Sequence, residues 1–333
     1  MKPSIIDVAK LANTSKSTVS RYLNGKSVKK KTEEALKKAI EELNYHPNMN
    51  ARRLVLNRTQ VIGIVVDDIS NNFYSGILKG IKDVSDNYGY DCVFYTWNKT
   101  RKKESDFINL IYEDQVDGLI FLSFAKRYQT EVELIRDAPF AVVMLGDNAG
   151  VEDVRSIDVD NQSGVVETVR YLYRIGHRNI AYIAGPEAAG ATAERTNGFK
   201  KAFEELGIEM NPDLIVTSDW SNQGGYTAMK KLLEVGGFSA VAASNDESAL
   251  GAMGAAHEEG YSIPKDFSIV GFDDIQISSW IYPSLTTVRQ PFTEMGKKAA
   301  EELFKQINGD GNFGAFRTLL SPKLMIRNSC LKV

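Results

Sequence analysis

Five side chains that donate hydrogen bonds lie within six residues near the amino terminus: Lys16, Ser17, Thr18, Ser20 and Arg21. Lysine and arginine donate to guanine or to phosphate, and the hydroxyls of serine and threonine bond either bases or the nucleic-acid backbone. Within this segment only Val19, Tyr22 and Leu23 are suited to face a protein core. The residue types therefore indicate a surface that reads nucleic acid, although an ordinary helical hairpin gives the same local pattern.

A second set of polar residues follows apolar runs further along the chain. These residues are Asp67-Asp68, Asp147, Asn245-Asp246 and Asp273-Asp274. Open parallel sheets bind ligands at the carboxyl ends of their strands. We therefore expect these side chains to converge on one cleft.

Two short helices must position the first group of donors. Ser4 and Asp7 have the spacing of a capping box, which predicts a helix that begins at Ile5. The polar run 13–15 interrupts the helical period, and a second helix is predicted over Lys16–Leu23. This is a helix-turn-helix pattern, in which the second helix lies in the major groove with its N-terminal residues at the base edges.

A third helix is predicted over residues 31–44. Its end is assigned to 45–47, because the residue before a proline avoids helical angles. The following segment, 48–60, is short, polar and basic, and reads as a linker with a weak helix at 49–56.

The charge of the chain is divided unevenly. Residues 1–60 contain 13 Lys and Arg against 5 Asp and Glu, a net charge of +8, so the rest of the chain carries −11 of the total of −3. A basic segment on an acidic body is the electrostatic footprint of binding to a polyanion. A solvated surface helix remains the alternative explanation of the charge run alone.

From residue 61 onward, strands and helices alternate. Strands are predicted at 61–68, 91–97, 117–123, 140–145, 155–160, 179–185, 214–217, 240–246 and 267–274, with helices at 75–88, 104–113, 129–136, 161–175, 193–206, 223–235 and 247–258. This alternation predicts a doubly wound α/β fold. About 270 residues exceed the size of one comfortable core, so we expect two lobes.

Several patterns argue against a membrane protein or an enzyme. Mean hydropathy is −0.25, no apolar run reaches the ~18 residues of a membrane span, and the N-terminus lacks a signal-peptide pattern. Cys92 and Cys330 lack metal-ligand spacing and fit a reducing compartment. We expect a cytoplasmic, nucleoid-associated protein.

Three patterns resemble catalytic, cofactor or metal sites, but the surrounding sequence of each one argues against that function. The GxGxxG at 309–314 follows a predicted helix and precedes a strand, the reverse of a dinucleotide site, and segment 24–27 lacks the first glycine of a phosphate loop. The three histidines are scattered, and His177 is predicted to cap or pack a helix-to-strand turn. We therefore expect no enzyme activity, no cofactor and no metal.

Taken together, the motifs resemble the LacI/GalR family of bacterial transcription repressors over nearly the whole chain. The matching segments are IIDVAKLANTSKSTVSRYLNG, ELNYHPNMNARRL, VIGIVVDDISNNFY, YLYRIGHRNIAYIAGP, ERTNGF, ASNDESALGAM, IPKDFSIVGFDD and PSLTTVRQP. The resemblance implies a small all-α helix-turn-helix head at 1–47, a hinge helix or linker at 48–59, and a core at 60–333. It also implies that the core is a two-lobe α/β unit like periplasmic sugar-binding proteins.

For the head and hinge, the resemblance implies a pseudo-palindromic double-stranded DNA operator as partner. The DNA-binding residues are then Ser4, Lys16, Ser17, Thr18, Ser20, Arg21, Asn24, Asn50, Arg53 and Leu54. Leu54 matches the apolar wedge that enters the minor groove beside its dimer mate, where new contacts offset the unstacking of a base step. The alternative for Leu54 is a residue of a small linker core.

For the core, the resemblance implies a small-molecule effector, most naturally a sugar or sugar phosphate. The effector-binding residues are then Phe73, Tyr74, Asp147, Arg195, Trp220, Asn245 and Asp273. Arginine and aspartate can grip adjacent hydroxyls, asparagine offers a donor and an acceptor, and an aromatic face covers the C–H side of a sugar. Capping or core packing is the structural alternative for Asp273 and Trp220.

The resemblance also assigns the lobes and the assembly. The N-lobe comprises about 60–159 and 291–318, the C-lobe about 160–288 and 319–333, and the expected assembly is a homodimer. The predicted function is a repressor of carbohydrate-utilisation genes that is switched by its effector. The alternatives are control by a phosphocarrier protein, a purine effector, or a sugar-binding receptor. A receptor would need a signal peptide and no basic head, and both features go against it.

Overall fold

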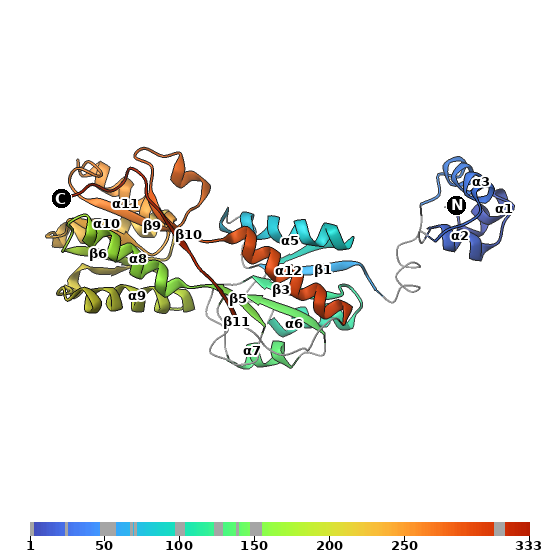
Figure 1. Cartoon of the computed structure of the whole chain (residues 1–333), viewed down its shortest axis with the longest axis horizontal. Coiled ribbons are helices and arrows are strands. Elements are labelled where there is room, and N and C mark those ends of the chain that lie inside the picture. Colours follow the sequence, from blue (N-terminus) through green and yellow to red (C-terminus); the bar gives the residue numbers. More distant parts are fainter. Residues whose placement is uncertain are drawn as a thin grey trace. The chain divides into compact units, whose positions relative to one another are not determined.

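The computed structural model describes residues 3–23, 26–46, 58–66, 69, 72–96, 104–122, 129–137, 140–146, 155–309 and 317–333. The chain divides into two compact units, Met1–Gln60 and Val61–Val333 (Figure 1). The first unit is called the head and the second the core. The predicted hinge helix, with Asn50, Arg53 and Leu54, lies outside the described residues.

The head consists of three helices. They are α1 (Ile5–Leu11), α2 (Lys16–Leu23) and α3 (Lys30–Glu42). The predicted start of α1 is confirmed, because the Asp7 carboxylate accepts hydrogen bonds from the Ser4 backbone N–H at 2.9 Å and from the Ser4 hydroxyl at 2.7 Å. The predicted bounds of α2 are also confirmed.

The end of α3 differs from the prediction. The helix ends at Glu42, and Asn44 has a φ of +45°, in the left-handed region that asparagine tolerates. The Tyr45 N–H then donates to the Ile40 carbonyl at 2.9 Å. The helix is therefore ended by a left-handed residue, and not by the proline effect that the sequence suggested.

The three helices of the head bury a small apolar core. Val8, Val19 and Leu36, one residue from each helix, are fully buried at its centre. Tyr22 and Leu23 pack against them as predicted. Because almost all of α2's apolar side chains are used here, its polar residues are left to solvent.

The first sheet of the core is entirely parallel, in the order β11-β5-β4-β3-β1-β2. Its strands are β1 (Val61–Val66), β2 (Asp91–Thr96), β3 (Gly118–Leu122), β4 (Ala141–Leu145), β5 (Ser156–Val159) and β11 (Arg317–Leu320). The central strands β1, β3 and β4 are buried throughout, whereas the edge strand β2 is largely exposed. This sheet and its helices form the N-lobe.

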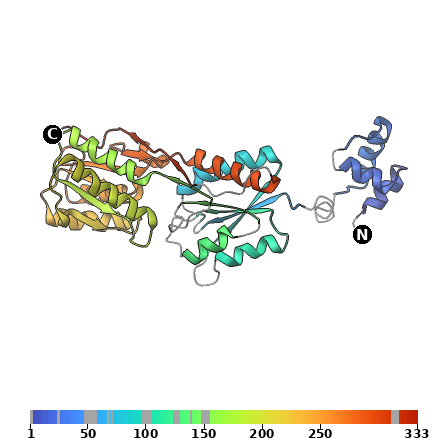
Figure 2. The ribbon, with the colours of Figure 1, turned by 60° about the horizontal axis from the view of Figure 1, so that its bottom comes forward.

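Helices cover both faces of the N-lobe sheet (Figures 1 and 2). One face packs against α5 (Ser75–Tyr88), which follows the short helix η1 (Asn72–Tyr74), and against α12 (Phe292–Asn308). The other face packs against α6 (Glu104–Tyr112) and α7 (Gln129–Arg136). The layered α/β fold predicted from the strand and helix alternation is thus confirmed.

The second sheet has the order β12-β10-β9-β8-β6-β7, and only β12 is antiparallel. Its strands are β6 (Ile180–Ala184), β7 (Ile215–Thr217), β8 (Ala240–Ala243), β9 (Ser268–Asp273), β10 (Thr286–Arg289) and β12 (Lys323–Met325). Its helices are α8 (Asn161–Arg174), α9 (Gly190–Leu206), η2 (Pro212–Leu214), α10 (Asn222–Val235), α11 (Asp246–Glu258) and η3 (Gln276–Ser279). This sheet and its helices form the C-lobe.

The chain passes between the lobes three times. The crossings follow β5, β10 and β11, so the chain enters the other lobe after residues 159, 289 and 320 (Figure 1). Strand β11 belongs to the N-lobe sheet up to Leu320, and the predicted lobe bounds stay a prediction. None of the helices in the described part of the chain is both long and apolar enough to cross a membrane.

Two local predictions can be compared with the C-lobe. Helix α9 begins at Gly190, three residues before the predicted start, because Ala191 and Thr192 are buried against the lobe despite the poor helix propensity of the neighbouring glycine. His177 is buried, and its two ring nitrogens lie 2.9 Å from the hydroxyls of Ser239 and Ser268. Its predicted packing role at a helix-to-strand turn is confirmed.

We predict that Leu36→Ala unfolds the head while the core stays folded. Truncating a fully buried leucine costs about 2–5 kcal/mol, which is large for a unit of this size. Hydrogen exchange of α1–α3 in the full chain should accelerate, and the main calorimetric transition of the core should be retained.

The control is Lys38→Ala, which removes an exposed side chain from the same helix. Exchange in the head should then match that of the wild type. Protected α1–α3 amides in Leu36→Ala, or loss of the core transition with them, would contradict the separate packing of the two units.

Candidate nucleic-acid interface and effector cleft

The outer face of α2 carries the predicted DNA-binding residues. Lys16, Ser17 and Arg21 are exposed, and Thr18 and Ser20 are partly buried. The buried Val19 fixes which way this face points, since it is the residue of α2 that enters the core of the head. Asn24 lies outside the described residues.

Some of the predicted donors already have partners within the head. The Ser15 hydroxyl lies 2.8 Å from the hydroxyls of Ser17 and Thr18, and it accepts from the Thr18 N–H at 3.2 Å. Ser4 donates to Asp7. These bonds hold the hydroxyls at the start of α1 and α2, where backbone N–H groups also point outward and suit contacts to phosphate.

Arg195 is the centre of the predicted effector set and is buried in the C-lobe. Its Nε donates to Asn161 Oδ1 at 2.8 Å, and its Nη1 donates to the Ser244 carbonyl at 2.5 Å. Nη1 also lies 3.8 Å from Asp273 Oδ1, and the guanidinium carbon lies 3.9 Å from the centre of the Phe272 ring. A guanidinium with these partners retains unused donors for a ligand.

Asp273, the first acid of GFDD, ends β9 beside Arg195. Its Oδ1 accepts from Gln290 Nε2 at 2.6 Å. Burial raises the pKa of Asp273, while the Arg195 guanidinium and the Gln290 donor lower it. The Asp273 carboxyl, held between Arg195 and Gln290, can accept a hydrogen bond from a ligand hydroxyl.

Asn245 and Trp220 complete the cluster from neighbouring loops. Asn245 caps α11, because its Oδ1 accepts from the Ser248 N–H at 3.0 Å, while its Nδ2 donates to the Trp220 carbonyl at 2.9 Å. The Trp220 indole donates to the Ser244 hydroxyl at 3.0 Å. Asn245 thus has one N–H and part of its carbonyl capacity left for a ligand.

Backbone strain concentrates at the same place. Trp220, Asp273 and Asp274 have φ angles of +68°, +125° and +58°. Such angles are unfavourable for residues with a Cβ and persist only where the surrounding structure holds them, often at ligand sites.

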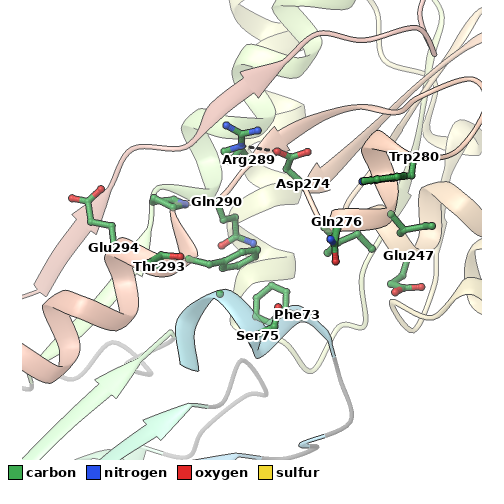
Figure 3. Close-up of a pocket in the computed structure, with 15 residues that line it drawn as sticks. Phe73, Ser75, Glu247, Asp274, Gln276, Trp280, Arg289, Gln290, Thr293 and Glu294 are labelled. Carbon is green, nitrogen blue, oxygen red and sulfur yellow. Dashed lines mark hydrogen bonds and ion pairs between the residues drawn. The ribbon is translucent and has the colours of Figure 1, made fainter. Parts of the chain in front are cut away.

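A cavity of about 900 Å³ lies between the two lobes of the core. Its walls come from α5, η3, α11 and the crossing between β10 and α12 (Figure 3). The residues that line it are Phe73, Ser75, Gly76, Glu247, Asp274, Ile275, Gln276, Ile277, Trp280, Arg289, Gln290, Pro291, Phe292, Thr293 and Glu294. Of the predicted effector residues that the structure describes, only Phe73 lines it, while Arg195, Asn245, Asp273 and Trp220 form the cluster described above.

The prediction for Tyr74 needs a correction. Phe73 stands on the cavity wall and meets Phe292 edge to face, with ring centres 4.6 Å apart. Tyr74 is buried in the apolar core of the N-lobe and does not line the cavity. The two rings meet edge to face with centres 5.4 Å apart, and only Tyr74, the inner of the two, is buried in the cluster. Asp147 lies outside the described residues.

Gln290 joins the cavity to the buried cluster and was missed from the sequence. It lines the cavity (Figure 3), and its Nε2 is bonded to Asp273. Its Oε1 is buried and accepts no hydrogen bond from the part of the chain that the structure describes. A buried acceptor without a partner is costly, which makes this oxygen a candidate contact for a ligand donor. The only signal in the sequence was its place in PSLTTVRQP, directly after a crossing strand.

Asp274, which the sequence placed at the cleft but not among the effector-binding residues, is held by two arginines. Arg289 Nε donates to it at 2.6 Å and Arg327 Nη2 at 2.5 Å. These bonds connect the end of β9 with the crossing strand β10 and with the chain after β12. Asp274 therefore stabilises the cavity wall.

A chain of polar contacts leads from Arg195 to the other crossing strands. Asn161, the partner of Arg195, donates to Glu194 at 2.9 Å, and Glu194 accepts from Arg317 of β11 at 3.0 Å. Arg317 Nη2 also lies 3.6 Å from Asp158 of β5. Burial raises the pKa of Asp158 to about 6.

Comparison with known proteins places this arrangement in a family. The description "bacterial regulatory proteins, lacI family" matches residues 4–48, and "periplasmic binding protein-like domain" matches residues 169–330. Catabolite control protein A of Priestia megaterium is 34% identical over 92% of this chain and 93% of its own length. The chain belongs to the LacI family. It is a transcriptional regulator of this type.

Solved structures of LacI-family proteins share its fold over almost the full length. A lac repressor dimer bound to operator and the anti-inducer ONPF has a TM-score of 0.87 at 28% identity, covering 99% of this chain and 100% of that chain. A complex of the transcriptional regulator CelR with cellobiose has a TM-score of 0.75 at 31% identity, covering 98% and 99%. A helix-turn-helix head and a two-lobe periplasmic-binding-protein-like core are thus shown for this LacI-family chain.

We predict that Asp158→Asn changes how stability depends on pH. The folded protein holds a proton on Asp158 up to about pH 6, whereas an ordinary aspartate releases it near 3.8. The stability that Asp158 contributes is therefore present below that ordinary value and falls, by on the order of 3 kcal/mol, as pH rises through about 6.

Urea denaturation between pH 4 and 8 measures this effect as the difference in unfolding free energy between wild type and Asp158→Asn. The wild type should lose stability relative to the variant as pH rises. The exposed Asp213→Asn serves as the control and should show no such trend. A constant difference for Asp158→Asn would mean that Arg317 keeps this carboxylate ionised.

Proposed function

We propose that this LacI-family chain is a homodimeric repressor of carbohydrate-utilisation genes that acts by binding and not by catalysis. Its head binds a pseudo-palindromic operator, and its core binds a small sugar or sugar phosphate that alters operator affinity. The observation that carries the effector part is the buried Arg195–Asp273 pair, which connects through Gln290 to the cavity between the lobes.

The exposure of Lys16, Ser17 and Arg21 on α2 supports the operator part of the proposal. The lac repressor structure with operator shares the fold of both units at 28% identity. By resemblance, Asn24, Asn50, Arg53 and Leu54 add contacts from outside the described residues, with Leu54 as a wedge in the minor groove.

The chemistry of the cleft supports a ligand with several hydroxyl groups. Arg195 and Asp273 offer a forked donor beside an acceptor, and the Gln290 oxygen lacks a donor. Phe73, Phe292 and Trp280 line the cavity with aromatic surface, which suits the C–H face of a sugar. The CelR neighbour is described in complex with cellobiose, a disaccharide.

Three exposed apolar side chains support a second copy of the chain as partner. Ile277, Trp280 and Tyr282 are 47%, 78% and 98% exposed within six residues of one turn. Large apolar side chains grouped on a surface mark association sites, and the lac repressor neighbour is described as a dimer. We call these three residues the turn surface and propose that it packs against a second copy.

For DNA binding, we predict that Ser17→Ala and Arg21→Ala weaken binding to an operator selected from a random duplex library by the wild-type protein. Loss of a base contact costs about 1–3 kcal/mol and relaxes the preference at that base pair. Gel-shift titration against the selected operator and its single-base variants measures both effects.

The control for these variants is Ser27→Ala, an exposed serine of the head outside α2. It should bind like the wild type. If Ser17→Ala and Arg21→Ala keep both affinity and base preference, α2 is not the helix that reads the bases.

For the effector, we predict that Asp273→Asn and Arg195→Lys abolish the ligand-induced rise in melting temperature. A ligand that binds the native state raises this temperature. The screen should contain neutral sugars, sugar phosphates and purines. Arg195→Lys keeps the positive charge that the buried pair requires but loses the forked donor.

Both variants should still bind the selected operator without ligand, and the exposed Gln223→Ala should respond like the wild type. An unchanged ligand shift in both variants would place the effector elsewhere. A purine hit would overturn the sugar proposal, and a wild type that responds only to a phosphocarrier protein would favour a protein partner.

A further inference from the structure

Asp246 is a fully buried carboxylate to which the proposed function gives no role. It is the first residue of α11 and follows the cap residue Asn245. Burial raises its pKa, with a further contribution from the neighbouring Asp273. A buried carboxylate is expensive unless donors surround it, so its partners indicate what it stabilises.

Three donors from separate segments converge on Asp246. The Ile275 N–H donates to Oδ2 at 2.9 Å, the Ser278 hydroxyl to Oδ2 at 2.6 Å, and the Thr287 hydroxyl to Oδ1 at 2.5 Å. Ile275 follows β9, Ser278 belongs to η3, and Thr287 lies in β10. Asp246 therefore connects α11 to both ends of the turn between β9 and β10.

The backbone of β9 leaves space for this arrangement. A Cβ at Gly271 would lie only 2.2 Å from Asp246 Oδ1. Any side chain at this position would push the carboxylate away from its partners. The close approach of strand and carboxylate thus depends on a glycine.

The turn that Asp246 holds has two surfaces. Residues 274–277 and Trp280 line the cavity between the lobes, and Ile277, Trp280 and Tyr282 form the exposed turn surface, so Ile277 and Trp280 belong to both. Within the turn, backbone bonds such as Trp280 N–H to the Ile277 carbonyl support η3 (Gln276–Ser279). The bonds to Asp246 are the ones that tie the turn to α11.

We infer that Asp246 is the positioning residue that holds the 274–282 turn in the form in which the turn surface packs against a second copy of the chain. This inference rests on the homodimer proposed above. Asp246 itself touches neither the second copy nor the effector, and it acts through Ile275, Ser278 and Thr287.

The experiment compares two isosteric substitutions in the C-lobe. Thr287→Val removes one donor to Asp246, and Thr168→Val removes the buried bond from Thr168 to the Gly164 carbonyl, 3.1 Å long, within α8. Sedimentation equilibrium of the full chain gives the dimer dissociation constant. Thr287→Val should raise it by about tenfold, equivalent to about 1.4 kcal/mol, whereas Thr168→Val should leave it unchanged.

Ser278→Ala provides an independent test, because it removes a second donor to Asp246 from within the turn. It should weaken the dimer like Thr287→Val. Hydrogen exchange of the 274–282 segment should accelerate in both variants and stay at the wild-type rate in Thr168→Val, which separates local positioning from a general loss of stability.

Trp280→Glu distinguishes failure of the inference from failure of the proposed dimer. If Trp280→Glu dissociates the dimer while Thr287→Val and Ser278→Ala associate like the wild type, the positioning role of Asp246 is wrong. If Trp280→Glu leaves the dimer intact, the turn surface is not the interface and the inference fails with it. A monomeric wild type would overturn the proposed homodimer itself.

Discussion

The positively charged side chain of Arg195 is almost entirely buried, and the neighbouring strand and helix ends of the C-lobe are arranged to stabilise this charge. Removing a guanidinium from water costs several kcal/mol unless good partners replace the solvent. Here the partners come from four places: the carboxylate of Asp273 after β9, the Ser244 carbonyl after β8, the Asn161 amide at the start of α8, and the Phe272 ring. The ends of two strands and one helix must therefore meet at Arg195 on α9, and Gln290 connects this meeting point to the cavity.

The same constraint connects the cleft to the junction between the lobes. Asn161 is shared between Arg195 and Glu194, and Glu194 is shared between Asn161 and Arg317 on the crossing strand β11. A ligand that bonds to the unused donors of Arg195 joins the network that Asn161 and Ser244 already form with it. Any difference in ligand affinity between two lobe arrangements shifts the balance between them by that difference and no more. The polar contacts at Asn161 and Glu194 connect Arg195 to β11, so they give a difference in ligand affinity between lobe arrangements a structural basis.

Local patterns in the sequence predicted the elements well wherever one face of a helix or strand is apolar. The bounds of α2 and α5 follow from their periodicity, because a single buried face determines each of them. Local periodicity did not predict features that depend on contacts between distant segments, such as the order of strands in a sheet. The apolar strands β1 and β2 look alike in sequence, yet β1 is central and β2 is an exposed edge. Phe73 and Tyr74 are adjacent, but only the path of η1 sends the second ring into the N-lobe core. Arg195 and Asp273 belong to recognisable segments, whereas Gln290 acquires its role only when β10 brings it beside Asp273.

Two residues of the turn at 274–282, Ile277 and Trp280, belong both to the cavity lining and to the proposed interface. Coupling between two binding equilibria is reciprocal, so a ligand that reshapes this turn changes self-association, and self-association changes ligand affinity by the same factor. Apparent affinity for the effector then depends on how much of the protein is present. Two cells with the same regulator sequence, one with few copies of the protein and one with many, would then respond at different effector concentrations. Abundance would thereby set the threshold of the genetic response.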